Sequence, residues 1–226
     1  MLSGLMLLIC VQYGLAQESV NQYDANGARH GVWKKFYPES DQVRYQGTFE
    51  HGKEVGTFYF YCEDCKDQPA FTKEFNTADN KAVVTHFNSR GKVLSTGTMI
   101  GKVRDGTWIY YHNNTTVVML EESYVNGQLD GLMTTYYENG NKSEELNYSA
   151  GVRHGANFYY SPAGVLIKSL NYENDVLQGP VEYYDATGAL IIKGQYKDDA
   201  KDGLWQYYTN GKLSKEERYP KQNKKQ

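Results

Sequence analysis

Large apolar and polar residues alternate along this chain in short runs, and the runs recur at a nearly fixed interval. Pairs of adjacent aromatic residues, with one His-Phe pair among them, mark the interval: Phe36-Tyr37, Phe60-Tyr61, His86-Phe87, Tyr110-Tyr111, Tyr136-Tyr137, Tyr159-Tyr160, Tyr183-Tyr184 and Tyr207-Tyr208. Successive pairs lie 24, 26, 24, 26, 23, 24 and 24 residues apart. A period of this length predicts a tandem-repeat protein, here of about eight units.

A glycine followed two residues later by a large side chain precedes most of these pairs. The clearest cases are Gly31-Val32-Trp33, Gly56-Thr57-Phe58, Gly106-Thr107-Trp108, Gly131-Leu132-Met133 and Gly203-Leu204-Trp205. Asn157 and Val181 take the large position after Gly155 and Gly179, and Lys81 stands where the third unit's glycine is expected. The second run of each unit ends on another periodic large residue: Phe49, Phe75, Met99, Tyr124, Tyr148, Tyr172, Tyr196 and Tyr219.

Turn-forming residues separate the runs. Pairs such as Asn139-Gly140 and Asn210-Gly211 follow the aromatic pairs and supply the positive φ that a two-residue hairpin turn needs. Another glycine turn, such as Asn126-Gly127, follows the second run. Each unit is therefore predicted to be a strand, a tight turn, a return strand and a looser turn. The predicted fold is all-β, an elongated antiparallel meander of about eight hairpins and sixteen short strands, with the aromatic pairs and the Gly-x-Trp side chains on one face.

The repeat pattern sets the domain boundaries. A repeat domain is predicted over residues 30–219, after a lead-in of residues 17–29 and before a basic, solvated tail of residues 220–226.

Residues 1–16 carry no charge and contain an apolar run, with small residues near their end. This pattern predicts a secretory signal peptide cleaved between Ala16 and Gln17. The apolar segment is shorter than the ~20 residues of a membrane span. No Lys or Arg precedes the apolar run, although signal peptides usually have one there. A retained anchor is the alternative to cleavage. Cleavage would leave no transmembrane segment and would place the protein in a periplasm, on an outer surface or in the medium.

Composition and charge narrow the function. The chain has 21 Tyr, 22 Gly and 5 Pro among its 226 residues, and its mean hydropathy is -0.69. These values favour short strands and tight turns over a thick aliphatic core. The 24 basic and 27 acidic residues are spread along the chain, with a net charge of -3. Because a nucleic-acid surface normally needs clustered basic residues, nucleic acid is not expected as a partner.

Two cysteines remain after the predicted cleavage. Cys62 and Cys65 form a single C-x-x-C, which supplies two of the four ligands that a structural zinc site normally needs. In an exported protein a small-loop disulfide is the favoured interpretation. Free thiols and a metal or redox site are the alternatives, and no cofactor is expected.

Candidate catalytic residues follow the repeat rather than breaking it. Acidic pairs recur at Glu121-Glu122, Glu144-Glu145 and Glu216-Glu217. Two carboxylates can run glycoside hydrolysis, but an enzyme needs its pair once and in one cleft. A solvated sheet face explains a repeated pair better, so a non-enzymatic protein is predicted. The candidate contact residues are periodic aromatics, which have a structural role and a candidate binding role: Trp33, Trp108, Trp205, Tyr111, Tyr137, Tyr160, Tyr184 and Tyr208.

The repeats resemble a known family. Residues 105–111 (DGTWIYY) and 202–213 (DGLWQYYTNGKL) resemble the bacterial variant of the MORN repeat, and the resemblance covers residues 26–219. It implies a non-enzymatic interaction scaffold. Proteins of this type are often labelled YwqK-type antitoxins, and other MORN proteins have been linked to membrane lipids. The expected function is therefore an exported scaffold that binds a protein or a cell-envelope component. An antitoxin-like factor that neutralises a toxin is the alternative, and contact with lipid at a membrane surface is a further expectation.

Overall fold

The computed structural model describes residues 19–76 and 78–220. Within them the chain forms twenty β-strands and no helix. The strands are β1 (Gln22–Tyr23), β2 (Arg29–Phe36), β3 (Val43–Glu50), β4 (Lys53–Phe60), β5 (Phe71–Phe75), β6 (Lys81–Phe87), β7 (Val93–Ile100), β8 (Val103–Tyr111), β9 (Val118–Val125), β10 (Gln128–Leu129), β11 (Gly131–Tyr136), β12 (Lys142–Ser149), β13 (Val152–Arg153), β14 (Gly155–Tyr160), β15 (Leu166–Glu173), β16 (Val176–Leu177), β17 (Gly179–Tyr184), β18 (Leu190–Lys197), β19 (Ala200–Thr209) and β20 (Lys212–Tyr219).

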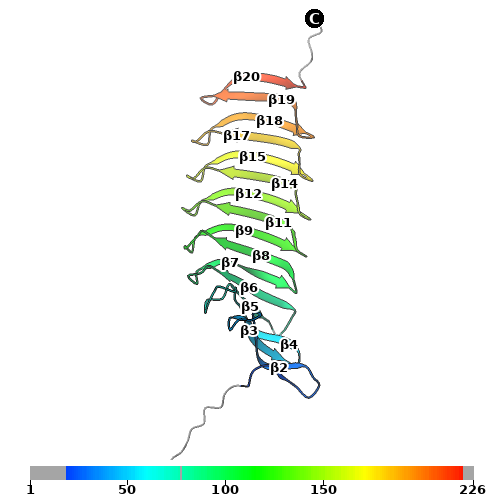
Figure 1. The fold of residues 1–226 in the computed structure, drawn as a ribbon. Coiled ribbons are helices and arrows are strands. Elements are labelled where there is room, and N and C mark those ends of the chain that lie inside the picture. Colours follow the sequence, from blue (N-terminus) through cyan, green and yellow to red (C-terminus); the bar gives the residue numbers. More distant parts are fainter. Residues whose placement is uncertain (1–18, 77, 221–226) are drawn as a thin grey trace, which may run out of the picture.

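The strands form one open antiparallel sheet in which each hairpin stacks on the one before it (Figure 1). Units one to eight are the hairpins β2–β3, β4–β5, β6–β7, β8–β9, β11–β12, β14–β15, β17–β18 and β19–β20. The predicted all-β meander is therefore confirmed. Four strands have only two residues, and the others have five to ten.

In every unit except the third, the glycine that opens the unit bends its strand. Gly106, for example, has a φ of 73°, which glycine adopts without steric cost. Next to it the ladder skips two residues, because Gly97 pairs with Trp108 whereas Thr98 pairs with Asp105. The short strands β10, β13 and β16 are the segments before such bends in units five to seven. We call Gly106 and its equivalents in the other units the bend glycines. The residue two positions before a bend glycine is called the lead residue of that unit.

The third unit departs from the sequence prediction. Gly106 pairs with Tyr124 across its hairpin, and in the third unit the residue paired with Met99 in the same way is Ala82. The expected position at Lys81 is therefore wrong by one residue. Ala82 does not have the positive φ of the bend glycines, so β6 begins without a bend.

The two kinds of turn are exchanged relative to the prediction. Between units, Asn126-Gly127 is a two-residue turn in which both residues have positive φ, 50° and 82°. We call the turn between the two strands of one hairpin its tip. At the tip of unit five the N–H of Tyr137 donates to the carbonyl of Asn141 at 2.8 Å, which leaves three residues in the loop. The last of these is Gly140, with a φ of 85°. Three-residue loops of this kind place a left-handed residue last. Only in unit eight is the tip the predicted two-residue turn, at Asn210-Gly211, among the described hairpins.

The expectation of a single aromatic face is also wrong. Neighbouring residues of a strand point to opposite sides of the sheet, so Tyr110 shares the face of Trp108 and Tyr111 lies on the other. In units one and five the aromatic pair is shifted by one residue, because Phe36 and Tyr136 occupy the paired position of Tyr111. We call the side carrying Trp108 the indole face and the opposite side the tyrosine face.

The core lies on the indole face. Its most buried large side chains, Phe58, Trp108 and Trp205, are each 1% exposed. Each ring lies on the backbone of a glycine in the preceding unit: a Cβ built on Gly97 would sit 2.3 Å from the indole of Trp108, and Gly194 has the same relation to Trp205. The absence of a side chain at these glycines is what lets the rings pack flat on the sheet.

Where a unit has a smaller residue at the position of Trp108, the preceding unit has a larger residue at the position of Gly97. Val181 is 1% exposed and packs in one cluster with Leu170 of the preceding unit. Continuing the register that joins Lys168 to Tyr183, Leu170 stands beside Val181 where Gly97 stands beside Trp108. In this layer the larger Leu170 offsets the smaller Val181, in line with close packing of protein interiors.

Candidate binding surface

One aromatic residue per unit lies on the tyrosine face at the same position of the hairpin. These residues, called the tyrosine row, are Phe36, Tyr61, Phe87, Tyr111, Tyr136, Tyr160, Tyr184 and Tyr208. Consecutive members are separated by two strands, which corresponds to about 10 Å. The row therefore presents an evenly spaced line of rings along the whole stack.

Side chains of the same face hold the tyrosine hydroxyls. The hydroxyl of Tyr160 donates to Oε2 of Glu145 at 2.5 Å, and that of Tyr184 donates to Oε2 of Glu182 at 2.6 Å. The hydroxyls of two further row members are bonded in the same manner, Tyr136 to Glu121 at 3.1 Å and Tyr208 to Gln206 at 3.1 Å. Such bonds fix the orientation of rings that are half-buried at their base.

These bonds keep the phenols neutral. Burial, followed by the hydrogen bond to Glu145, raises the pKa of Tyr160 to about 12. The hydrogen bond to Glu182, followed by burial, raises the pKa of Tyr184 to about 12. Proximity of a carboxylate disfavours the phenolate because both are anions.

The carboxylates of this face also have cationic partners. Lys142 Nζ lies 2.5 Å from Oε1 of Glu145, and Lys193 Nζ lies 3.4 Å from Oε1 of Glu182. The bond from Lys142, and then that from Tyr160, lowers the pKa of Glu145. The charges beside the row are therefore largely compensated within the face.

A groove of about 560 Å³ opens on the tyrosine face at units three and four. Its lining residues include Val93, the ring of Tyr111 and the threonines at positions 85, 96, 115 and 116. The hydroxyls of Thr85 and Thr96 are 3.2 Å apart. One wall is the tip of unit four, where His112 N–H donates to the carbonyl of Val117 across four residues, one more than in units three, five, six and seven. We call this hollow the threonine groove.

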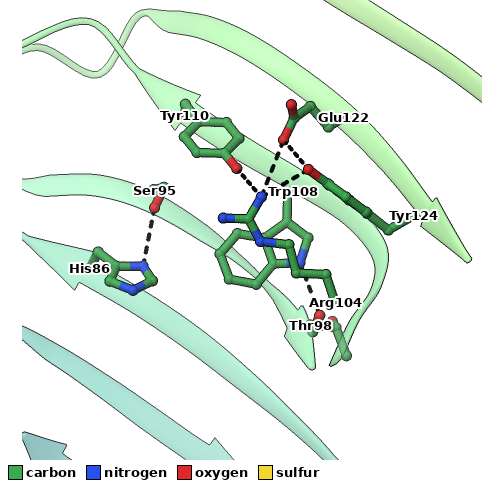
Figure 2. A network of polar contacts seen from close by, with 8 residues as sticks. All are labelled: His86, Ser95, Thr98, Arg104, Trp108, Tyr110, Glu122 and Tyr124. Carbon is green, nitrogen blue, oxygen red and sulfur yellow. Dashed lines mark hydrogen bonds and ion pairs between the residues drawn. The ribbon is translucent and has the colours of Figure 1, made fainter. Parts of the chain in front are cut away.

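On the indole face, by contrast, the chain's own cations cover aromatic rings in units one, four, six and eight. In unit four the guanidinium of Arg104 lies 4.4 Å from the centre of the Trp108 ring and donates to the hydroxyls of Tyr110 and Tyr124 at 2.7 and 2.8 Å. Glu122 lies 3.5 Å from the same nitrogen (Figure 2). Burial, and then the hydrogen bond to Glu122, raises the pKa of Tyr110. This cluster is internally satisfied and holds the unit together.

The same arrangement recurs at other lead residues. Arg29 lies 4.9 Å from the Trp33 ring, Arg153 lies 4.1 Å from the Tyr172 ring, and Lys201 lies 4.0 Å from the Trp205 ring. Cation–π contacts of this geometry contribute ~0.5–2 kcal/mol each. The aromatic rings of the indole face are therefore structural in these units.

A second hollow, of about 1200 Å³, lies at the bend edge of units one to three, where Ala82 replaces a bend glycine. Phe60 and Phe75 line it, and the lead residue of unit two is Glu54 instead of a cation. Lysines and carboxylates both surround it, including Lys73. Its mixed charges indicate no single ligand chemistry.

The structure divides the aromatic residues that the sequence singled out. Trp108 and Trp205 lie under lead cations, and Trp33 packs edge-on against Tyr23 near the start of the stack. Tyr137 lies at a hairpin tip, where its hydroxyl donates to the carbonyl of Tyr160 in the next unit at 2.8 Å. The remaining candidates belong to the tyrosine row: Tyr111, Tyr160, Tyr184 and Tyr208.

Sequence reasoning missed the other row members and the threonine groove. Tyr61 and Phe87 are the second members of their pairs, as Tyr111 is. Phe36 and Tyr136 enter the row when the units are aligned on the bend glycines instead of on the aromatic pairs. The groove depends on the longer tip of unit four. The sequence signal for this tip is the interval of 25 residues from Gly106 to Gly131, one more than between the later bend glycines.

The acidic pairs do not converge. Glu121 lies on the tyrosine face and bonds to Tyr136, whereas its neighbour Glu122 lies on the indole face and bonds to Tyr124 at 2.8 Å. Adjacent strand residues point apart, so the two carboxylates of a pair cannot flank one bond of a substrate.

Cys62 and Cys65 lie in the tip of unit two and are joined by a disulfide, with Cα atoms 5.0 Å apart. The oxidised state of this pair in the purified protein stays a prediction. Among the described residues, no group of three His, Cys, Asp or Glu side chains is placed to hold a metal ion.

The predicted signal peptide, with its cleavage site at Ala16 and Gln17, lies outside the described residues, as does the tail after Pro220. Over residues 19–76 and 78–220, no helix is long and apolar enough to cross a membrane.

Three segments of the chain match the family model described as MORN repeat variant: residues 129–150, 177–198 and 201–219. Each begins at a lead residue, at Leu129, Leu177 or Lys201, and they cover units five, seven and eight. These three units are therefore similar to the MORN repeat variant. No curated protein matches the chain.

Of the remaining hairpins, those of units four and six share the register of the matched ones, because Gly106 and Gly155 pair with Tyr124 and Tyr172 as Gly179 pairs with Tyr196. MORN repeats commonly act as non-catalytic binding scaffolds, and no enzymatic family is indicated.

Proposed function

We propose that this MORN-repeat protein is an exported scaffold that binds a protein or a cell-envelope component through its tyrosine face. The observation that carries the proposal is the tyrosine row, in which an aromatic ring recurs at the same position of every unit. The hydroxyls at positions 136, 160, 184 and 208 are held by neighbouring side chains, as between Tyr160 and Glu145. Preorganised aromatic side chains give large contact area at low entropic cost. The indole face is already occupied by residues such as Arg104.

Export rests on the uncharged apolar leader of residues 1–16 and on the cysteine pair. We expect the mature protein to begin at Gln17. Intact-mass measurement and N-terminal sequencing of natively expressed protein, after separation of cytoplasm and envelope, test this. A cytoplasmic chain that retains Met1 contradicts it.

Binding is tested by affinity capture, with the mature protein as bait and the native envelope fraction as the source of partners. A variant lacking residues 203–226 should stay folded, because each unit of a stacked repeat depends only on its neighbours. Its capture should weaken in proportion to the units removed. Loss of all capture with one particular unit would indicate a single local site. Retention of Met1 together with capture of a small cytoplasmic toxin would support the antitoxin-like alternative.

A further inference from the structure

We infer that the tyrosine row binds a neutral, extended, β-linked glycan, with one disaccharide placed over each repeat unit. This inference rests on the proposed function and names the class of ligand for the same surface.

The first reason is spacing. Row members such as Tyr160 and Tyr184 occupy equivalent positions in successive units, and two strands separate them. The resulting step of about 10 Å is similar to the length of one extended β-1,4-linked disaccharide. Such a glycan presents the same face at every second sugar, so a straight chain would meet a ring at each step. An α-1,4-linked chain curves and loses this register.

The second reason is the chemistry of the row. The apolar face of a pyranose packs on aromatic rings, and its hydroxyls need hydrogen-bond partners at the ring edge. Beside Tyr160 and Tyr184 the carboxylates of Glu145 and Glu182 provide acceptors, each already holding the tyrosine hydroxyl. Bonded tyrosines hold their orientation in the free protein, which lowers the cost of ordering them on binding.

The third reason is charge. Lys142 and Lys193 form ion pairs with Glu145 and Glu182, so the strip beside these rings carries compensated charges. A polyanion such as an anionic lipid surface would face the carboxylates, and a basic peptide would face the lysines. In both cases like charges would repel each other, and a neutral polyhydroxylated ligand avoids this repulsion.

The threonine groove provides a deeper position on the same line. Tyr111, four threonines and Lys92 are among the residues that line it, and its volume of about 560 Å³ accommodates a disaccharide. Hydroxyls such as those of Thr85 and Thr96 both donate and accept hydrogen bonds, which suits a ligand made of hydroxyl groups.

Isothermal titration of the full mature protein with defined oligosaccharides tests the inference. The probes are cellohexaose and chitohexaose, which are β-1,4-linked, their disaccharides cellobiose and chitobiose, and maltohexaose as the α-linked control. We expect at least one β-linked hexasaccharide to bind, with an affinity at least about fourfold above that of its disaccharide, because each further ring contact adds about 2- to 10-fold. Maltohexaose should not bind.

Row variants locate the contact. Tyr160→Ala and Tyr184→Ala should each lower the affinity for the hexasaccharide about 2- to 10-fold, whereas Tyr160→Phe, which keeps the ring, should lose less than Tyr160→Ala. Tyr23→Ala is the matched control, since Tyr23 is 64% exposed and lies outside the row. Thermal unfolding of each variant separates loss of contact from loss of fold, and Tyr160→Phe carries the comparison if an alanine variant unfolds.

Two failures are distinguishable. If neither β-linked hexasaccharide binds at millimolar concentration, while the envelope fraction still captures the protein, the glycan inference is overturned and the proposed scaffold function stands. Equal binding of maltohexaose, or affinities unchanged in both alanine variants, also overturns the glycan inference. Absence of any capture by the envelope fraction refutes the proposed function itself.

Discussion

The packing of an indole on a glycine makes Gly97→Ala the most informative single change in this chain. A Cβ at position 97 would lie 2.3 Å from the ring of Trp108. Gly97 does not have a positive φ, so alanine is compatible with the backbone and the effect is steric. The ring has little freedom to move, because its Nε1 donates to the carbonyl of Thr98 at 3.0 Å and Arg104 covers its outer face.

The expected magnitude follows from two opposing effects. Overpacking a well-filled site typically costs about 1–3 kcal/mol, and a contact this short places Gly97→Ala near the upper end. The gain from a less flexible unfolded chain is about 0.4–1 kcal/mol. We therefore expect a net loss of about 2 kcal/mol in the free energy of unfolding, measured by urea denaturation with far-UV circular dichroism at an unchanged m-value.

A double-mutant cycle tests the mechanism. Trp108→Val imitates unit seven, where Val181 packs beside Leu170 instead of a glycine. Alone it should cost about 3 kcal/mol or more, but combined with Gly97→Ala the total should fall at least ~1 kcal/mol short of the sum. Gly140→Ala, at a tip with no atom within 4 Å, should be additive with Trp108→Val. A neutral Gly97→Ala, or an additive cycle, would refute the packing argument.

Three further predictions follow from single contacts. Arg104→Leu should destabilise the protein by about 1–3 kcal/mol, because Glu122, whose side chain is 14% exposed, loses its cation; adding Glu122→Leu should recover most of the loss in urea unfolding, since unit five has leucines at both equivalent positions. The pKa of Tyr184 is raised from 10.0 to about 12, so its bond stabilises the fold fully below pH 10 and is lost as pH rises through 12; pH-dependent unfolding should show a smaller alkaline loss in Tyr184→Phe. Cys62 and Cys65 should resist alkylation until reduction and then take two adducts by mass spectrometry, with a modest change in melting temperature because the closed loop is short.

The repeat and the all-β fold class could be predicted from the sequence because they depend on local chemistry. Glycines that must adopt positive φ, such as Gly106, recur at a fixed distance from aromatic residues, and alternation along a strand decides which residues share a face. The same rule, applied strictly, separates Tyr110 from Tyr111. The prediction of a single aromatic face is therefore wrong, although the alternation along each strand is present in the sequence.

Other features depend on which residues of different units meet. Gly97 and Arg104 decide whether Trp108 contacts a ligand or has a structural role. Gly97 lies eleven residues before Trp108, in the preceding unit, and Arg104 lies four residues before it, across a bend. The threonine groove exists because the tip of unit four leans toward unit three, where Asn88 donates to Asn114 at 3.0 Å. The periodicity of the sequence determines which positions of a repeat are strand or turn and which face of the sheet they occupy. Burial, pairing and exposure of a side chain depend on the neighbouring unit, and only the stacked structure brings those residues together.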